Sequence, residues 1–151
     1  RAPRLALPPL NIGIMAVRYQ DIFQLDRTEA IQMAKKTSGY SFAFQVLGYF
    51  TWQYPSDPER VRGMYKQYLE EYVYEKIWDE MSTGDRKVAS AMAQVTDGSV
   101  KEIRKLLGME TNQFNPYRVR LIRKGIADGD EYGKLKFALP MFGEFVQENT
   151  V

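Results

Sequence analysis

The chain has no cysteine and no histidine among its 151 residues. Without cysteine there is no disulfide framework, no cysteine nucleophile and no zinc site of the Cys or Cys/His kind. Without histidine, Ser-His-Asp triads and every histidine general base are excluded as well. Much of common enzyme chemistry is therefore excluded by composition alone, and the lack of cysteine fits a reducing compartment.

Long hydrophobic runs are also missing. No apolar stretch of the sequence approaches the roughly 18 to 20 residues that a membrane span needs, and the N-terminus lacks the charged-then-apolar layout of a signal peptide. We therefore expect a cytoplasmic protein with no membrane partner. Because the chain opens on Arg1 rather than on methionine, we also expect it to be a segment of a longer protein.

Both common phosphate-binding loops are absent. A P-loop has the pattern Gly-x4-Gly-Lys-Ser/Thr, but the only Gly-Lys pair, Gly133-Lys134, is followed by Leu135. The Gly-x-Gly-x-x-Gly pattern of dinucleotide sites does not occur either. The chain by itself is therefore predicted not to be an enzyme, with no catalytic residue, no bound cofactor and no metal.

What is present describes a globular, mainly helical chain. Hydrophobic residues make up 44% of it, and 21 Lys and Arg oppose 19 Asp and Glu, so neither disorder nor a polyelectrolyte is indicated. The spacing of the apolar residues is helical over most of the length. We predict a mainly α fold, in which a four-helix subdomain is followed by a winged helix-turn-helix domain with a small β-hairpin.

The first half is predicted to begin with three short helices. Residues 1–10 are apolar and broken by proline, which suits the tail of a strand leaving a sheet. Asn11 caps the first helix, and Asp26 caps a second helix that ends at Gly39. Residues 42–52 are apolar nearly all round, which favours a buried third helix.

A long helix follows from Pro58 to Met81, because apolar residues recur there every three or four positions. Ser56 and Glu59 have the spacing of a capping box at its start. From Ser82 the texture changes to shorter, more basic elements. The predicted organisation is therefore a remnant strand at 1–10, a helical domain at 11–81 and a winged-helix domain at 82–151.

The second half has the element order of a winged helix, with three helices before a hairpin. The predicted elements are helices at 85–95 and 99–107, a third helix ending at Gly125, strands at 126–127 and 134–139, and a closing helix at 140–146. Ser99 and Glu102 form a capping box for the second helix, and Gly108 ends it.

The start of the third helix depends on Pro116. A start at Thr111 would place this proline inside the helix, where it removes a backbone hydrogen bond. A cap at Asn115 would place it in the first turn, where it is harmless. We therefore predict the later start, or a turn of irregular helix before it.

Charge is unevenly distributed along the chain. Residues 1–82 carry ten basic and ten acidic side chains, whereas residues 99–124 carry seven basic and two acidic ones, a net charge of +5. In a winged helix this basic stretch forms the helices that meet the DNA backbone and the major groove. The predicted DNA contacts are Asn112, Gln113, Arg118, Arg120, Arg123, Lys124 and Lys134. Because Asp128, Asp130 and Glu131 at the hairpin tip would repel phosphates, docking to a protein partner or to its own chain stays an alternative.

Other candidate features favour structural roles. Glu71, Glu75 and Asp79 recur every four residues away from the apolar stripe, which is typical of a solvated helix face and, second, of a partner surface. The acidic hairpin tip resembles half of a calcium loop, but the remaining ligands and the distal glutamate are missing. The ten tyrosines and two tryptophans fall mostly at core-facing helical positions, so most are predicted to pack inside.

Four stretches together carry a resemblance to a known family: Leu7-Pro-Pro-Leu10 and residues 36–49, 117–126 and 133–140. With these the chain resembles the C-terminal part of a prokaryotic P-loop ATPase of the AAA+/STAND-like group, a helical lid followed by a winged helix. The resemblance covers essentially the whole chain.

The resemblance implies a module that closes over ATP and Mg²⁺ held in a separate, N-terminal P-loop core and passes the nucleotide state to the winged helix. The implied nucleotide-contacting residues are Pro9, Leu10, Gly39, Tyr40 and Ser41, with Ser41 standing where the family usually has proline. Two alternatives remain: a DNA-binding transcriptional regulator whose first domain senses or dimerises, and a winged helix used for protein contacts or self-association.

Overall fold

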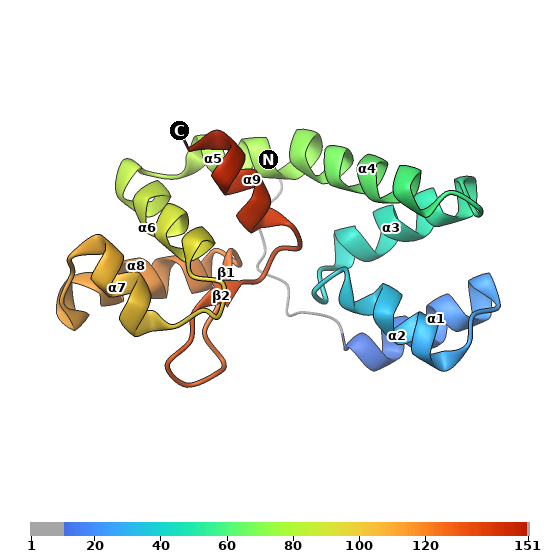
Figure 1. Ribbon diagram of the computed structural model, residues 1–151, viewed down its shortest axis with the longest axis horizontal. Coiled ribbons are helices and arrows are strands. Elements are labelled where there is room, and N and C mark those ends of the chain that lie inside the picture. Colours follow the sequence, from blue (N-terminus) through green and yellow to red (C-terminus); the bar gives the residue numbers. More distant parts are fainter. Residues whose placement is uncertain (1–10, 151) are drawn as a thin grey trace. The chain divides into compact units, whose positions relative to one another are not determined.

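The computed structural model describes residues 11–150 and is mainly helical (Figure 1). The predicted strand remnant at residues 1–10, with Pro9 and Leu10, lies outside the described residues. The chain divides into two compact units between Glu75 and Lys76, slightly before the predicted boundary at Ser82. No helix within residues 11–150 combines the length and the apolarity needed to cross a membrane.

The first unit is built from helices that are capped by residues next to them in the sequence. Its elements are α1 (Ile12–Phe23), α2 (Arg27–Lys35), α3 (Ser41–Gln53), α4 (Pro58–Leu69) and the π-helical turn η1 (Glu70–Tyr74). As predicted, the Asn11 side chain accepts from the amide of Ile14, and Asp26 forms a capping box with Glu29.

The predicted end of the second helix at Gly39 is wrong, because α2 ends at Lys35. The buried Thr37 side chain explains the early stop: its hydroxyl donates to the Ala34 carbonyl at 2.7 Å and accepts from the Gly39 amide at 3.2 Å. Gly39 lies beyond the helix in a left-handed conformation, with φ 75°.

Buried tyrosines tie the helices of this unit together. The Tyr19 hydroxyl donates to the Phe44 carbonyl at 2.6 Å, and the Tyr65 hydroxyl donates to the Lys36 carbonyl at 2.8 Å. Around Tyr19, the α1 residues Met15 and Ala16 pack against the small α2 residues. Each hydroxyl thereby satisfies a carbonyl in or beside another helix, so the tyrosines fix how the helices pack.

The long helix differs from its prediction in two ways. It consists of α4, η1 and α5 (Glu75–Glu80), so a π-helical turn interrupts the expected continuous α-helix. The cap is Asp57, whose carboxylate accepts from the amide of Arg60 at 3.2 Å, and the predicted capping box of Ser56 and Glu59 is wrong. Pro58 does occupy the first turn, which leaves the residue just before it as the cap.

The second unit adds a small sheet to a helical core. After α5 come α6 (Thr83–Gln94), α7 (Val100–Leu107), α8 (Thr111–Arg123), β1 (Ala127–Asp128), β2 (Lys136–Phe137) and α9 (Phe142–Asn149). The antiparallel strands pair Ala127 with Phe137 and Asp128 with Lys136. The first strand is shifted by one residue from its prediction, and the second is shorter than the predicted 134–139. A separate bridge joins Ser99, between α6 and α7, to Lys134.

The core of the second unit lies where α6 packs against α7, α8 and α9. Its fully buried side chains come from every layer: Val88 and Ala89 of α6, Ile103 of α7, Phe114 and Leu121 of α8, Leu135 beside the sheet, and Phe142 and Val146 of α9. This core holds α8 against the unit by one face only.

The later start predicted for the third helix is wrong. The helix α8 begins at Thr111 and contains Pro116. Phe114 is only 1% exposed and anchors the first turn in the core. Pro116 itself lies on the solvent side, where water can satisfy the carbonyl that loses its partner.

Candidate nucleic-acid interface on helices α7 and α8

The capping residues of α7 and α8 position both helices. Ser99 accepts from the amide of Glu102 and so caps α7, but the predicted capping box is not formed, because the Ser99 amide donates to Oδ1 of Asp97 at 3.0 Å. Gly108 ends α7 in a left-handed conformation with φ 66°. The amide of Glu110 donates to Oε1 of Gln113 at 2.8 Å, within a capping box. Gln113, a predicted DNA contact, is therefore used to begin α8.

The outward side of α8 is a distinct surface, which we call the α8 face: Asn112, Asn115, Pro116, Val119 and Arg123, all exposed and spaced by three and four. Val119 is 53% exposed. No hydrogen bond or ion pair of the Asn112, Asn115 or Arg123 side chains occurs within residues 11–150. The α8 face therefore presents two amides and one guanidinium to a ligand.

Arg120 and Lys124 point instead to an acid on α6. Asp85 is only 1% exposed, and both its carboxylate oxygens accept from Arg120 Nε at 3.1 Å. A further nitrogen of Arg120 donates to Oδ1 at 2.8 Å, and Lys124 Nζ lies 4.0 Å from Oδ2. The hydrogen bonds from Arg120 to Asp85 raise the pKa of the guanidinium above its usual value. These two predicted DNA contacts thus pair with Asp85, while their side chains stay 34% and 44% exposed.

Tyr117 and Gly84 complete the contact between α6 and α8. The Arg120 guanidinium lies 5.2 Å from the centre of the Tyr117 ring, a cation–π geometry. A Cβ at Gly84 would come within 2.8 Å of that ring, so only glycine permits this approach. The ion pair of Arg120 with Asp85 is therefore accompanied by the packing of Tyr117 against Gly84.

Arg118 holds the base of the hairpin loop. A terminal nitrogen of its guanidinium donates to the carbonyl of Gly129 at 3.2 Å. A Cβ at Gly129 would come within 2.5 Å of the guanidinium, so this close approach also needs glycine. Lys134 takes part in the bridge to Ser99 through its backbone, at the far end of the loop.

The hairpin tip is acidic and open to solvent. Asp128 accepts from the amide of Asp130 at 2.8 Å, and Glu131 lies 3.8 Å from Lys136. Between them Tyr132 is fully exposed. The loop between the strands runs from residue 129 to 135, one residue longer than the connection at 128–133 between the predicted strands.

Fewer basic side chains are therefore free of an ion pair than the seven counted in residues 99–124 of the sequence. The excess of +5 over residues 99–124 includes Arg120 and Lys124, which share Asp85. Lys101 and Lys105 on α7 and Arg123 on α8 are exposed, and their side chains make no ion pair within the described chain.

Sequence reasoning missed Asp85. An acid in the first turn of a helix normally faces solvent and complements the helix dipole, and nothing in the local pattern marks one that is buried. Asn115 was predicted as a cap rather than as a surface residue, and its outward position follows from the earlier start of α8.

The implied nucleotide-contacting residues belong to the first unit. Gly39, Tyr40 and Ser41 form the turn from α2 into α3, with Gly39 buried and the other two half-buried. The turn is held by Thr37, as described above. The two remaining residues of that set, Pro9 and Leu10, lie outside the described part.

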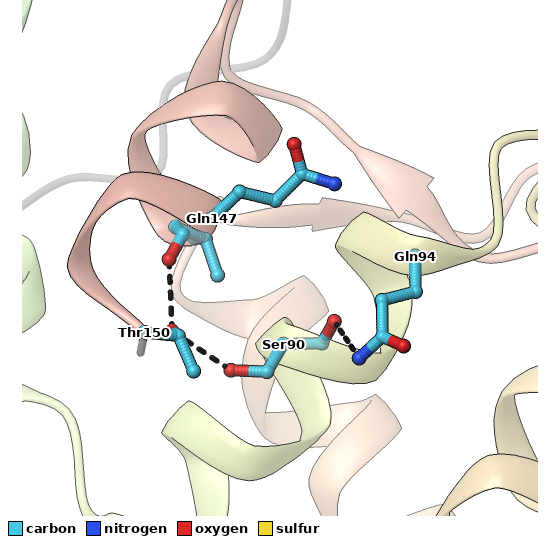
Figure 2. Close-up of a pocket in the computed structure, with 5 residues that line it drawn as sticks. Ser90, Gln94, Gln147 and Thr150 are labelled. Carbon is cyan, nitrogen blue, oxygen red and sulfur yellow. Dashed lines mark hydrogen bonds between the residues drawn. The ribbon is translucent and has the colours of Figure 1, made fainter.

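The second unit also has a hollow between α6 and α9 (Figure 2). Its lining residues are Ser90, Gln94, Val146, Gln147 and Thr150. The Ser90 and Thr150 hydroxyls lie 3.1 Å apart, and Thr150 also donates to the Val146 carbonyl. None of these side chains titrates, so the hollow offers no acid–base chemistry. Residues 11–150 contain no group of acidic residues that could hold a metal ion.

Comparison with known proteins identifies a family for the second half of the chain. A family model described as "Domain of unknown function (DUF8462)" matches residues 71–146. The chain belongs to the DUF8462 family. The DUF8462 segment contains Asp85, the α8 face and all the predicted DNA-contacting residues. The turn formed by Gly39, Tyr40 and Ser41, which we call the Gly39 turn, lies outside it. No curated protein and no solved structure matches the chain.

Proposed function

We propose that residues 76–150 form a winged-helix domain that contacts double-stranded DNA through the α8 face. The isolated bridge between Ser99 and Lys134 supports the winged-helix assignment, because it pairs the segment between α6 and α7 with the residues that lead into β2. The amide of Leu135 donates to the Gly98 carbonyl at 2.8 Å, and that of Val100 donates to the Gly133 carbonyl at 2.9 Å. A plain helix-turn-helix has no such sheet.

The α8 face is the observation that carries the DNA assignment. It places two asparagines and an arginine, the side chains suited to base edges and phosphates, on the exposed side of the third helix. Lys101 and Lys105 stand on the neighbouring α7, where the second helix of such domains crosses the DNA backbone. The acidic loop tip limits the wing to a minor share of the binding.

Salt dependence tests this proposal. With three to four phosphate contacts, the logarithm of the affinity for a mixed-sequence duplex falls with the logarithm of salt concentration at a slope of roughly −3. Replacing Arg123→Gln lowers the affinity and reduces that slope by about one. The matched control is Lys87→Gln, which removes an exposed lysine from α6. Fluorescence anisotropy with a labelled duplex measures all three proteins.

A salt-independent interaction, or equal losses in the Arg123 and Lys87 variants, would contradict DNA contact through the α8 face. Either result favours the alternative in which this surface docks a protein. Loss of binding with Arg120→Gln alone is not diagnostic, because that variant also leaves the buried Asp85 without its main partner.

We further propose that residues 11–75 act as the lid of an ATP-binding switch whose P-loop core lies outside this sequence. The resemblance carries this proposal, and the Gly39 turn supports it by presenting Tyr40 and Ser41 from a rigid, internally hydrogen-bonded bend. Since the P-loop and its Mg²⁺-binding acid supply phosphoryl-transfer catalysis, the chain alone should neither hydrolyse ATP nor bind it tightly.

Calorimetric titration with ATP and Mg²⁺, together with a phosphate-release assay, tests this second proposal. The expected result is no turnover and no binding in the micromolar range. Turnover that survives removal of contaminating ATPases would overturn the lid assignment. Adding a P-loop core protein in trans is the complementary experiment, and the lid assignment predicts that the chain changes its nucleotide affinity.

A further inference from the structure

Several aromatic side chains gather at the surface of the first unit, although, of the ten tyrosines and two tryptophans together, seven are buried or half-buried. Four exposed residues of α3, α4 and η1, which we call the aromatic face, are Tyr49, Trp52, Tyr68 and Tyr72. Their exposed fractions are 54%, 68%, 36% and 64%. Trp52 lies one helical turn from Tyr49, so the two share a side of α3.

Ring contacts hold this surface in place. The Tyr68 ring centre lies 4.4 Å from Tyr72, 6.0 Å from Phe42 and 5.9 Å from the buried Phe50. Tyr49 contacts Phe50 in turn, at 5.2 Å. Because the rings are already positioned, a ligand that lands on them has little side-chain entropy to remove.

The exposed charges that closely follow these rings along the helix are two acidic and one basic. Helix α3 (Ser41–Gln53) contains no charged residue. On the other helix, Glu71 and Glu75 follow Tyr68 and Tyr72 by three positions across the π-helical turn, and the exposed Lys76 follows Glu75, so carboxylates outnumber ammonium groups within about one turn of the rings. Both carboxylates are exposed; Glu71 accepts from Gln67 at 3.0 Å, and the Glu75 side chain makes no contact of this kind within residues 11–150.

The π-helical turn lies within this surface. It spans Glu70–Tyr74 and so includes Glu71 and Tyr72. A π turn has poorer backbone geometry than the α-helix around it, and such turns recur where helices carry a function. The turn is therefore an independent reason to look for a ligand here.

We propose that the aromatic face docks a cationic, amphipathic segment of a partner protein. Lysine or arginine side chains of that segment lie over the tyrosine rings and opposite Glu71 and Glu75, and its apolar side chains pack on Trp52 and Tyr49. The attraction is local, since the whole chain carries a net charge of +2 and would repel a cation overall. This partner site is separate from the α8 face and goes beyond the DNA proposal.

Two synthetic helical peptides test the proposal with the full chain. One is built from leucine and arginine, and its counterpart has glutamate at every arginine position. The arginine peptide should bind at least about tenfold more tightly, as measured by anisotropy of a fluorescent label, because only it pairs with the rings and the carboxylates. Equal affinity of the two peptides would overturn the choice of a cationic partner.

Matched variants locate the binding. Tyr72→Ser and Glu75→Gln should each weaken the arginine peptide by about fivefold. Ile22→Ser and Asp21→Asn, at exposed positions of α1, are the controls and should leave it unchanged. Unchanged binding in Tyr72→Ser, with circular dichroism showing an intact fold, would overturn the site. Analytical ultracentrifugation of the chain without peptide tests whether the aromatic face binds a second copy instead. A dimer that dissociates in the Tyr72→Ser variant would overturn the proposal.

Discussion

Asp85 shows how one buried carboxylate changes the meaning of a basic stretch. It has almost no contact with water, and Arg120 and Lys124 reach it from one side of α8, four residues apart. From the sequence these two cations count towards a DNA-binding surface. In the folded unit they neutralise a charge that would otherwise be costly to bury, so their first role is to fix α8 on α6.

Replacing Arg120 should therefore cost stability more than specific binding. Arg120→Gln removes the hydrogen bonds to both Asp85 oxygens and leaves only Lys124, at 4.0 Å, as a counter-charge. We expect a loss of roughly 2 to 3 kcal/mol in the free energy of unfolding, below the full cost of an unpaired buried charge because Arg120 is partly solvated. Urea unfolding followed by circular dichroism measures it.

Arg123→Gln is the matched control for this experiment. The side chain lies in the same last turn of α8 but faces solvent, so its removal should change the free energy of unfolding by less than about 0.5 kcal/mol. The two variants should thus separate, with Arg120 affecting stability and Arg123 affecting the salt slope of DNA binding. Equal stability of the two would mean that the contact with Asp85 contributes little in solution.

At the scale of single elements, the sequence predicted most of the local helix ends, although it missed the cap at Asp57. Asn11, Asp26 and Ser99 cap helices, and Gly108 ends one, because each acts within its own turn of backbone. Pro116 was misjudged for the converse reason. Its local cost is outweighed by the burial of Phe114 two residues earlier, which is a tertiary effect that no short pattern displays.

The π-helical turn at Glu70–Tyr74 could not be predicted from the sequence pattern. Apolar residues spaced by three and four fit an α-helix, and one wider turn disturbs that spacing too little to be noticed over a long helix. It matters because it sets which residues share a face. The rings of Tyr68 and Tyr72 face solvent together, although the spacing assigned them to the core.

The basic stretch on α7 and α8 could be predicted from the sequence, but which of its side chains remain available could not. Charge placement pointed to α7 and α8, where the α8 face lies. Which side chains remain available depends on partners from other elements: the Gly129 carbonyl for Arg118 and Asp85 for Arg120. Gln113 is taken by the start of its own helix. Pairings across elements are absent from any linear pattern.

At the scale of the whole molecule, the two units hold their buried polar groups differently. The second unit relies on the charged contact of Asp85 with Arg120, whereas the first relies on neutral tyrosine hydroxyls that donate to carbonyls. Burial raises the pKa of Tyr19, Tyr65 and Tyr74, with smaller contributions from neighbouring groups for Tyr19 and Tyr74. All three belong to the unit that ends at Glu75.

This difference predicts that residues 11–75 unfold first in alkali. A tyrosine whose pKa is raised by folding contributes stability that is complete below the unfolded pKa of about 10 and is lost as the pH rises above it. Three such groups lower the free energy of unfolding by roughly 4 kcal/mol per pH unit, about 1.4 each. Urea titrations between pH 9 and about 11.5 measure the slope, and hydrogen exchange assigns the opening to residues 11–75. Tyr19→Phe should remove about a third of it; an unchanged slope in this variant, or an equal slope for residues 76–150, would contradict the assignment.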